Sequence, residues 1–293
     1  MALQSQSSAR KTYRLARDNV FAALFASSVV AGVLVLAWLL FEVFIDSFGW
    51  LDWQFLSSYS SRHPDQAGVL APIAGTFWVI ILTAVMTVPV GIATAIYLEE
   101  FAPANRVTRL IQLNISNLAG VPSVVYGLLG LAIFVQYLFD GQRSLLAGAL
   151  TLSLLVMPIV IIASQEAIRA VPPSYRDAAY AMGATRWQVV KMVVLPQAIP
   201  SMMSGIILAM SRAIGETAPI LVVSSLVFIT YVPTTPFDRF TVLPLQIVTW
   251  VSQPQDDFRH IAAAAIVILL VMLLTMNAAA IYIRAKFQRR AEY

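Results

Sequence analysis

Cysteine is absent from this chain of 293 residues, and histidine is rare. The lack of cysteine excludes disulfide bonds, thiolate catalysis and cysteine-ligated metal sites. The two histidines, His63 and His260, lie far from any cluster of other potential ligands, so no metal site is predicted. Charged residues make up only 12% of the chain, whereas soluble domains typically carry about 25%. The basic residues form no stripe interleaved with aromatic residues, so the sequence gives no indication of nucleic-acid binding.

Apolar residues dominate the composition instead. They make up 59% of the chain, and the mean hydropathy is +0.78. A helix needs about 20 apolar residues to cross the hydrocarbon core of a bilayer, and six stretches are long enough. We therefore predict an all-α, polytopic membrane protein with six transmembrane helices. The predicted spans are 19–45, 70–98, 110–139, 145–163, 201–226 and 261–283.

The loops between these spans differ in positive charge. One alternating set, with both ends of the chain, holds fourteen Lys and Arg, and the opposite set holds four. Since basic residues are retained on the cytoplasmic side, both termini are predicted to be cytoplasmic. The first apolar run is too long for a signal peptide and is interpreted as a retained span. The fourteen are Arg10, Lys11, Arg14, Arg17, Arg106, Arg109, Arg169, Arg176, Arg186, Lys191, Arg284, Lys286, Arg289 and Arg290, and the four are Arg62, Arg143, Arg239 and Arg259.

The most informative segment is the predicted cytoplasmic loop 172–196, called the knob from here on. Ser174 with an acidic residue three positions later makes a capping box, which predicts the start of a short helix. That helix should end at Gly183, because glycine readily takes the left-handed conformation that follows a helix. Thr185 begins a second capping box, and the second helix is predicted to end before Pro196.

The knob also carries a longer pattern. It resembles the EAA motif of ABC importer permeases, E-A-A-x3-G-x9-I-x-L-P, with Asp in place of Glu and Val193 in place of Ile. The residues that match the motif positions are Asp177, Ala178, Ala179, Gly183, Leu195 and Pro196.

This resemblance implies a role for the knob. In that family the motif forms the coupling helix, which lies in a groove of the ATP-binding subunit. Ala178 and Ala179 would let the partner approach closely, Gly183 would supply the bend, and Asp177 would pair with a basic residue of the partner. The chain has no Gly-x-x-x-x-Gly-Lys-Ser/Thr loop for binding ATP. ATP and Mg²⁺ would then be used by a separate subunit, and this chain would be neither an enzyme nor the holder of a cofactor.

The fifth predicted span carries charge inside the bilayer. Arg212 and Glu216 are four residues apart, which places them on one helical face where they can pair. A charge at the bilayer centre costs about 2.5–3.5 kcal/mol, so such residues are usually retained for function. Two interpretations are open: the pair neutralises itself and locks helices together, or Arg212 contacts an anion while Glu216 weakens its hold. Thr217 belongs to the same segment, and Pro219 should kink the helix.

The third predicted span contains a similar interruption around Pro122. Gly127 and Gly130, just beyond it, are interpreted as sites of close helix packing. Three polar residues beside the interruption are candidates either for lining the route of an oxyanion or for helix packing: Asn117, Ser123 and Tyr126.

These segments carry a finer resemblance. Residues 117–130, 212–219 and 97–101 are similar to signatures of the phosphate-specific branch of the ABC importers, and more similar to its PstA type than to its PstC type. The resemblance implies a multi-pass protein of the bacterial plasma membrane, surrounded by lipid. Its expected partners are a PstC-type sister permease, two PstB-type ATP-binding subunits and a PstS-type phosphate-binding protein. Transport of inorganic phosphate would proceed by alternating access.

The expected organisation follows. Residues 1–69 hold the N-terminus, the first span and an extracytoplasmic loop, residues 70–284 form the permease core with coupling helices at 174–195, and residues 285–293 form a tail. A molybdate or sulfate importer would share the knob. A secondary anion transporter would share the spans and the buried charges but would not need the knob. A membrane scaffold would be expected to carry a sizeable soluble domain, which the loops are too short to form.

Overall fold

The computed structural model describes the backbone of residues 2–224 and 228–291 and the side chains of residues 18–224 and 228–286. Throughout these residues the regular structure is helical, without a strand. The predicted end of the fifth span, at residues 225–226, lies outside the described residues. So do the side chains of six basic residues used to orient the chain: Arg10, Lys11, Arg14, Arg17, Arg289 and Arg290.

The helices vary from single turns to more than ten turns. In chain order they are α1 (Ala2–Asp46), α2 (Trp53–Ser57), the 3₁₀ turn η1 (Pro64–Gln66), α3 (Leu70–Ile96), the π-helical segment η2 (Tyr97–Phe101), α4 (Arg106–Ala119), α5 (Ser123–Gly130), the π-helical η3 (Leu131–Leu138), α6 (Leu145–Arg169), α7 (Pro173–Ala181), α8 (Arg186–Val189), the π-helical η4 (Val190–Val194), α9 (Leu195–Gly215), α10 (Ala218–Ser224), α11 (Leu243–Val251) and α12 (Asp257–Ala291).

Five helical stretches of the described chain are long and apolar enough to cross a membrane, and one bent pair of helices makes a sixth when it is counted as one broken span. The prediction of an all-α, six-span membrane protein is therefore confirmed. The five stretches are Asp18–Asp46, Leu70–Phe101, Leu145–Arg169, Arg186–Gly215 and Asp257–Lys286, and the bent pair is Arg106–Ala119 with Ser123–Leu138.

Two predicted boundaries were wrong. The fourth span continues through Pro158 to Arg169 instead of ending at residue 163. The fifth begins within the knob, at Arg186, instead of at residue 201. In both places the helix runs past the apolar stretch, because backbone hydrogen bonding continues while the side chains become polar. A proline inside a membrane helix is tolerated when neighbouring helices satisfy the freed backbone groups.

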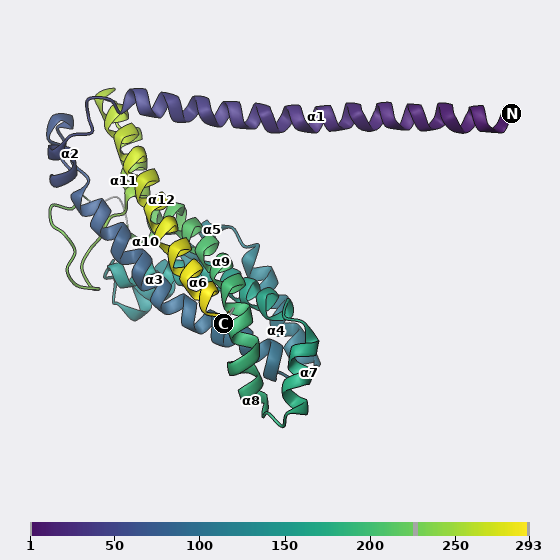
Figure 1. The fold of residues 1–293 in the computed structure, drawn as a ribbon. Coiled ribbons are helices and arrows are strands. Elements are labelled where there is room, and N and C mark those ends of the chain that lie inside the picture. Colours follow the sequence, from purple (N-terminus) through teal and green to yellow (C-terminus); the bar gives the residue numbers. More distant parts are fainter. Residues whose placement is uncertain (1, 225–227, 292–293) are drawn as a thin grey trace.

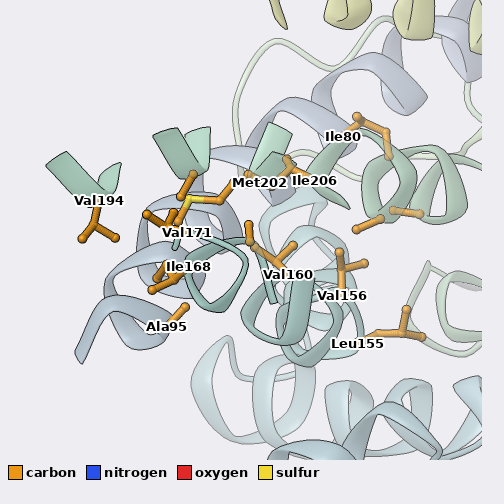
Figure 2. Packing of buried hydrophobic residues seen from close by; sticks show 14 of the residues in the cluster. Ile80, Ala95, Leu155, Val156, Val160, Ile168, Val171, Val194, Met202 and Ile206 are labelled. Atoms are coloured by element: carbon orange, nitrogen blue, oxygen red, sulfur yellow. The ribbon is translucent and has the colours of Figure 1, made fainter. Parts of the chain in front are cut away.

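The core is built around α6. Two thirds (67%) of its apolar window is buried, whereas the windows of the other four long stretches are at most 33% buried. Figure 2 shows buried side chains from α3, α6 and α9 that meet here, among them Ile80, Val160 and Met202. Because α3 and α9 both pack against α6, the three helices form the centre of the bundle.

The two ends of the bundle carry different structures. In Figure 1, α2 and α11 lie at one end and α7 and α8 project from the other. At the first end Phe55 packs against Trp250, with ring centroids 6.0 Å apart. The long helix α1 runs away from the body, and the apolar window of its span is entirely unburied in this chain. His260 holds its last turn through a contact of 3.1 Å between Nδ1 and the Asp46 carbonyl oxygen.

Candidate functional site

The knob consists of two short helices joined by a tight turn, as the sequence predicts. Gly183 has φ = +81°, the left-handed conformation that favours glycine. Thr185 caps α8 with a capping box: its backbone N–H donates to the Gln188 side chain at 2.7 Å, and the Gln188 N–H donates to the Thr185 hydroxyl. Both the bend and the second capping box are confirmed.

The capping box predicted at Ser174 was wrong. Helix α7 begins at Pro173, after Pro172, and no side chain caps its N-terminus. Proline is favoured at the first position of a helix because its φ is already helical and its missing N–H needs no partner. The helix therefore starts before Ser174, whose hydroxyl can no longer act as the N-cap.

The second helix was also predicted wrongly, because it does not end at Leu195. It passes through the π-helical η4 into α9, with Pro196 in the first turn of α9. A π-helical turn shifts the hydrogen-bond register by one residue. This shift lets the helix continue where a proline without an N–H would otherwise interrupt it. The knob is thus continuous with the fifth span.

The motif residues fall on two sides of the knob. Asp177 and Ala178 are exposed, whereas Ala179 packs against the buried apolar core around α6. Leu195 and Pro196 are half-buried where the knob joins the bundle. The exposed side also presents Met182, which is 88% exposed, and Trp187. Sequence reasoning missed these two, although a tryptophan in a short polar helix is a signal for a contact surface.

The predicted ion pair in the fifth span is present. Arg212 Nε lies 3.1 Å from Glu216 Oε1, with the Arg212 side chain 55% exposed in this chain and that of Glu216 only 16% exposed. The helix does not merely kink, as predicted, but ends at Gly215 and restarts at Ala218. Pro219 cannot donate to the Gly215 carbonyl, and the break places the proline in the first turn of α10, where it needs no donor. Thr217 lies in this break.

The third span is broken as well. Helix α4 and the stretch Ser123–Leu138, which comprises α5 and η3, meet at 103°, with Pro122 as the N-cap of α5. The Tyr126 side chain is buried, and its hydroxyl donates to the Leu118 carbonyl at 2.8 Å, so that Tyr126 holds the bend in place. Asn117 is exposed on α4, and Ser123 is half-buried at the start of α5.

Close helix packing brings the two broken spans together. A Cβ added at Gly127 would lie 2.8 Å from Pro219 Cα, so α5 and α10 touch backbone to backbone. One added at Gly130 would clash with the Thr151 side chain. The packing roles predicted for these two glycines are confirmed. Arg143 also fixes α10, because its Nη1 donates to the carbonyl oxygens of Val222 and Val223, at 2.9 and 3.2 Å.

Two ion pairs near the base of the knob were not predicted from the sequence, although their four residues lie in segments that it had already singled out. Glu99 pairs with Arg169 at 2.7 Å, and Glu100 pairs with Arg176 at 3.0 Å. Two adjacent carboxylates at the end of a predicted span were the available signal, but charge alone does not say which arginine each one meets. Within the part of the chain that the structure describes, no group of three or more His, Asp or Glu is arranged to hold a metal ion.

Comparison with known proteins identifies a family and several similar proteins. Residues 87–292 match the family described as binding-protein-dependent transport system inner membrane component. The chain is 34% identical over 290 residues to the phosphate transport system permease protein PstA 1 of Mycobacterium tuberculosis, covering 94% of this chain and 91% of that protein. It is 34% identical over 215 residues to the probable ABC transporter permease protein YqgI of Bacillus subtilis, covering 73% and 70% of the two chains.

A solved structure shares the fold. A chain of the bacterial alginate ABC transporter superposes with a TM-score of 0.71 at 15% identity, covering 93% of this chain and 96% of that one. The predicted type I importer permease fold is confirmed by this likeness. The family match spans more than half of the chain, and it agrees with the six spans and the EAA-like knob. The chain therefore belongs to the family of binding-protein-dependent transport inner membrane components, the membrane-spanning permeases of ABC importers.

Proposed function

We propose that this chain is the PstA-type permease subunit of an ATP-driven, binding-protein-dependent importer of inorganic phosphate. The observation that carries the proposal is Arg212, held by Glu216 at a break in one span and half-exposed in the single chain. A guanidinium is a planar fork of donors that matches the oxygens of a phosphate ion. The relatives named as phosphate transport permeases support the same cargo.

Glu216 moderates this site. Its carboxylate is mostly buried and occupies Arg212 Nε, which leaves the other guanidinium nitrogens for a ligand. A neighbouring carboxylate also lowers the positive potential that a passing anion meets, and so favours release. Thr217, in the same break, and Asn117 and Ser123, on the second broken span, are the other residues of this chain that we place along the pathway. Tyr126 supports it by holding the bend.

The pathway is completed by a second subunit. The exposed face of Arg212 and the exposed α4 fit a translocation route shared with a PstC-type sister permease. The knob would dock on one of two PstB-type ATPases through Asp177, Ala178 and the surface around Trp187. ATP and Mg²⁺ are bound and used by those subunits, so this chain is not the enzyme. A PstS-type protein delivers phosphate on the opposite side of the membrane.

The proposed cycle is alternating access. ATP binding brings the two ATPases together and moves the knobs, which opens the permease pair toward the binding protein. Hydrolysis restores the inward-facing state. Both termini and the knob face the cytoplasm in this arrangement, in accord with the excess of basic residues on that side. The permease core comprises residues 70–284, and residues 1–69 and 285–293 flank it.

The test is ATP-dependent uptake of labelled phosphate into proteoliposomes that contain this chain with its sister permease, ATPase and binding protein. We expect uptake that excess sulfate and molybdate do not inhibit. A complex that assembles and hydrolyses ATP but takes up sulfate or molybdate in preference to phosphate would refute the cargo.

A further inference from the structure

The segment Tyr97–Phe101 (η2), at the end of α3, contacts the end of α6 and both helices of the knob. Successive residues of a helical turn point in different directions, so three neighbours in sequence can contact three different elements. Glu99 faces the end of α6, Glu100 faces α7, and Phe101 faces α8. π-Helical turns are often found at functional sites. This one places each of the three side chains against a different helix.

The first contact joins α3 to the end of α6. Glu99 accepts two hydrogen bonds from the Arg169 guanidinium, at 2.7 and 2.9 Å, and a third from the Gln165 amide at 2.8 Å. A bidentate arginine–carboxylate pair fixes orientation as well as distance. The last turns of α3 and α6 therefore move together.

The second contact joins α3 to the knob. Arg176, on α7, donates to Glu100 at 3.0 and 3.2 Å and to the carbonyl oxygens of Val171 and Ile168 at 2.6 and 2.9 Å. The Arg176 side chain is 19% exposed and that of Glu100 is 9% exposed, so this pair is shielded from water. Because Arg176 also donates to carbonyl oxygens at the end of α6, it connects its own helix α7 both to the end of α3 and to the end of α6.

The third contact involves the second knob helix. Phe101 packs against Trp187 with ring centroids 6.4 Å apart, and the Arg186 guanidinium lies 5.4 Å from the centre of the Phe101 ring. This contact is apolar and cation–π in nature, so it persists independently of the two ion pairs. The η2 segment thus holds both helices of the knob.

This third attachment changes how the knob can move. The chain itself connects the knob to the bundle at two places, through residues 170–172 to α6 and through η4 to α9. With only these two attachments, the knob could still rotate about the line that joins them. A third attachment to α3 removes that rotation, so a displacement of the knob must displace α3 as well.

We propose that η2 is the joint that makes the knob, α3 and α6 one moving body, with Glu100 as its main positioning residue. This proposal rests on the proposed function, because the force that acts on the knob is the movement of an ATPase subunit. When an ATPase moves the knob, the joint carries the displacement into α3 and α6, which pack along each other in the core. Without the joint the knob would turn about its two chain connections, and hydrolysis would continue without moving the permease.

The test is Glu100→Gln in the complete complex in proteoliposomes. Two ratios are measured: phosphate imported per ATP hydrolysed, and ATP hydrolysis with the binding protein relative to hydrolysis without it. We expect both ratios to fall by about fivefold or more, the usual range of coupling between sites. A purely structural role would reduce the amount of active complex and leave both ratios unchanged, so wild-type ratios in Glu100→Gln would overturn the proposal.

Glu166→Gln is the matched control. Glu166 also pairs with Arg169, at 3.1 Å, but within α6 and in an exposed position. Glu166→Gln removes the same charge from the same neighbourhood but keeps both the Glu99–Arg169 and the Glu100–Arg176 pairs, and we expect wild-type ratios. Reduced ratios in this control would show that charge rather than the joint sets the coupling, and would overturn the proposal.

Two further variants keep the test decisive. If the complex with Glu100→Gln does not assemble, Phe101→Leu is measured instead, because it loosens the contact with α8 and retains both ion pairs. Reduced ratios in Phe101→Leu would support the joint, and wild-type ratios would overturn the proposal. Glu100→Cys with Arg176→Cys would be the only cysteines of this chain. Bridging them with a short bis-maleimide should restore coupling, and a bridged complex that stays uncoupled would contradict the joint.

Failure of the cargo is distinguishable from failure of the joint. A wild-type complex that hydrolyses ATP without importing phosphate would refute the proposed cargo. The stimulation of hydrolysis by the binding protein would still report on the joint in that case.

Discussion

The substitution Gly75→Ala tests how closely α3 packs against the chain that leads into α11. A Cβ at position 75 would overlap the carbonyl oxygen of Thr241 and lie 3.2 Å from its carbonyl carbon. Both are backbone atoms, so no side-chain rotation can relieve the clash. The adjacent Thr76 is buried, and its Oγ1 accepts a hydrogen bond of 2.8 Å from the Leu243 N–H. Separating the two segments enough to fit a methyl group breaks that bond.

Three contributions set the magnitude. Overpacking of a well-packed site costs about 1–3 kcal/mol. Leaving the buried Leu243 N–H without a partner costs about 1–3 kcal/mol. Replacing glycine by alanine inside a helix contributes about 1 kcal/mol in the opposite direction. We therefore expect Gly75→Ala to lower the free energy of unfolding by about 3 kcal/mol from these terms.

The assay is reversible unfolding of the purified chain in mixed micelles, followed by tryptophan fluorescence. Thr76→Val isolates the hydrogen bond and should cost about 1–3 kcal/mol. The double variant should cost less than the sum of the two, because the same bond is lost once. Gly120→Ala is the control, since its Cβ would meet only one atom, at 3.5 Å. Equal stability of Gly75→Ala and Gly120→Ala would refute the reasoning.

Further predictions concern the knob and the loop that contains Asp238. Thr185→Ala removes the observed cap and should destabilise α8 by about 1 kcal/mol. Ser174→Ala, at the position where no capping box forms, should leave the stability of α7 unchanged. Amide exchange across the knob measures both variants, and an equal effect of the two would contradict the capping assignment. Hydrogen bonds from Thr235 and then Thr234 lower the pKa of Asp238, so the stability that they contribute is present above the ordinary carboxyl pKa and is lost as pH falls through the lowered value. The protection of the 234 and 235 amides, measured as their exchange rate relative to the intrinsic rate at each pH, should therefore fall as pH is lowered, and Asp238→Asn should remove that pH dependence of protection; an unchanged dependence would contradict it.

Features set by local chemistry could be predicted from the sequence. Gly183 and Thr185 act through their own backbone conformations and neighbours three residues away, so the bend and the cap follow from the residues alone. Apolar length likewise fixes the six spans. The Arg212–Glu216 pair is also local, because helical spacing brings the two side chains together.

Features that depend on competition or on distant partners could not be predicted. Ser174 lost its capping role because Pro173 starts the helix earlier, and Pro196 did not end a helix because η4 shifts the register before it. The pairing of Glu100 with Arg176 depends on how α3 and α7 lie in space, which charge patterning does not specify. The contact between the two broken spans at Gly127 has the same origin.

The most direct test of the central claim compares three variants of the intramembrane pair in phosphate uptake by the assembled complex: Arg212→Ala, Glu216→Ala and both together. If Arg212 contacts the anion, losing hydrogen bonds worth about 1.5–3 kcal/mol should slow uptake about tenfold or more. The double variant should then stay as slow as Arg212→Ala, with ATP hydrolysis retained. Recovery of uptake in the double variant would show that the pair only neutralises itself, and would contradict a phosphate pathway at Arg212.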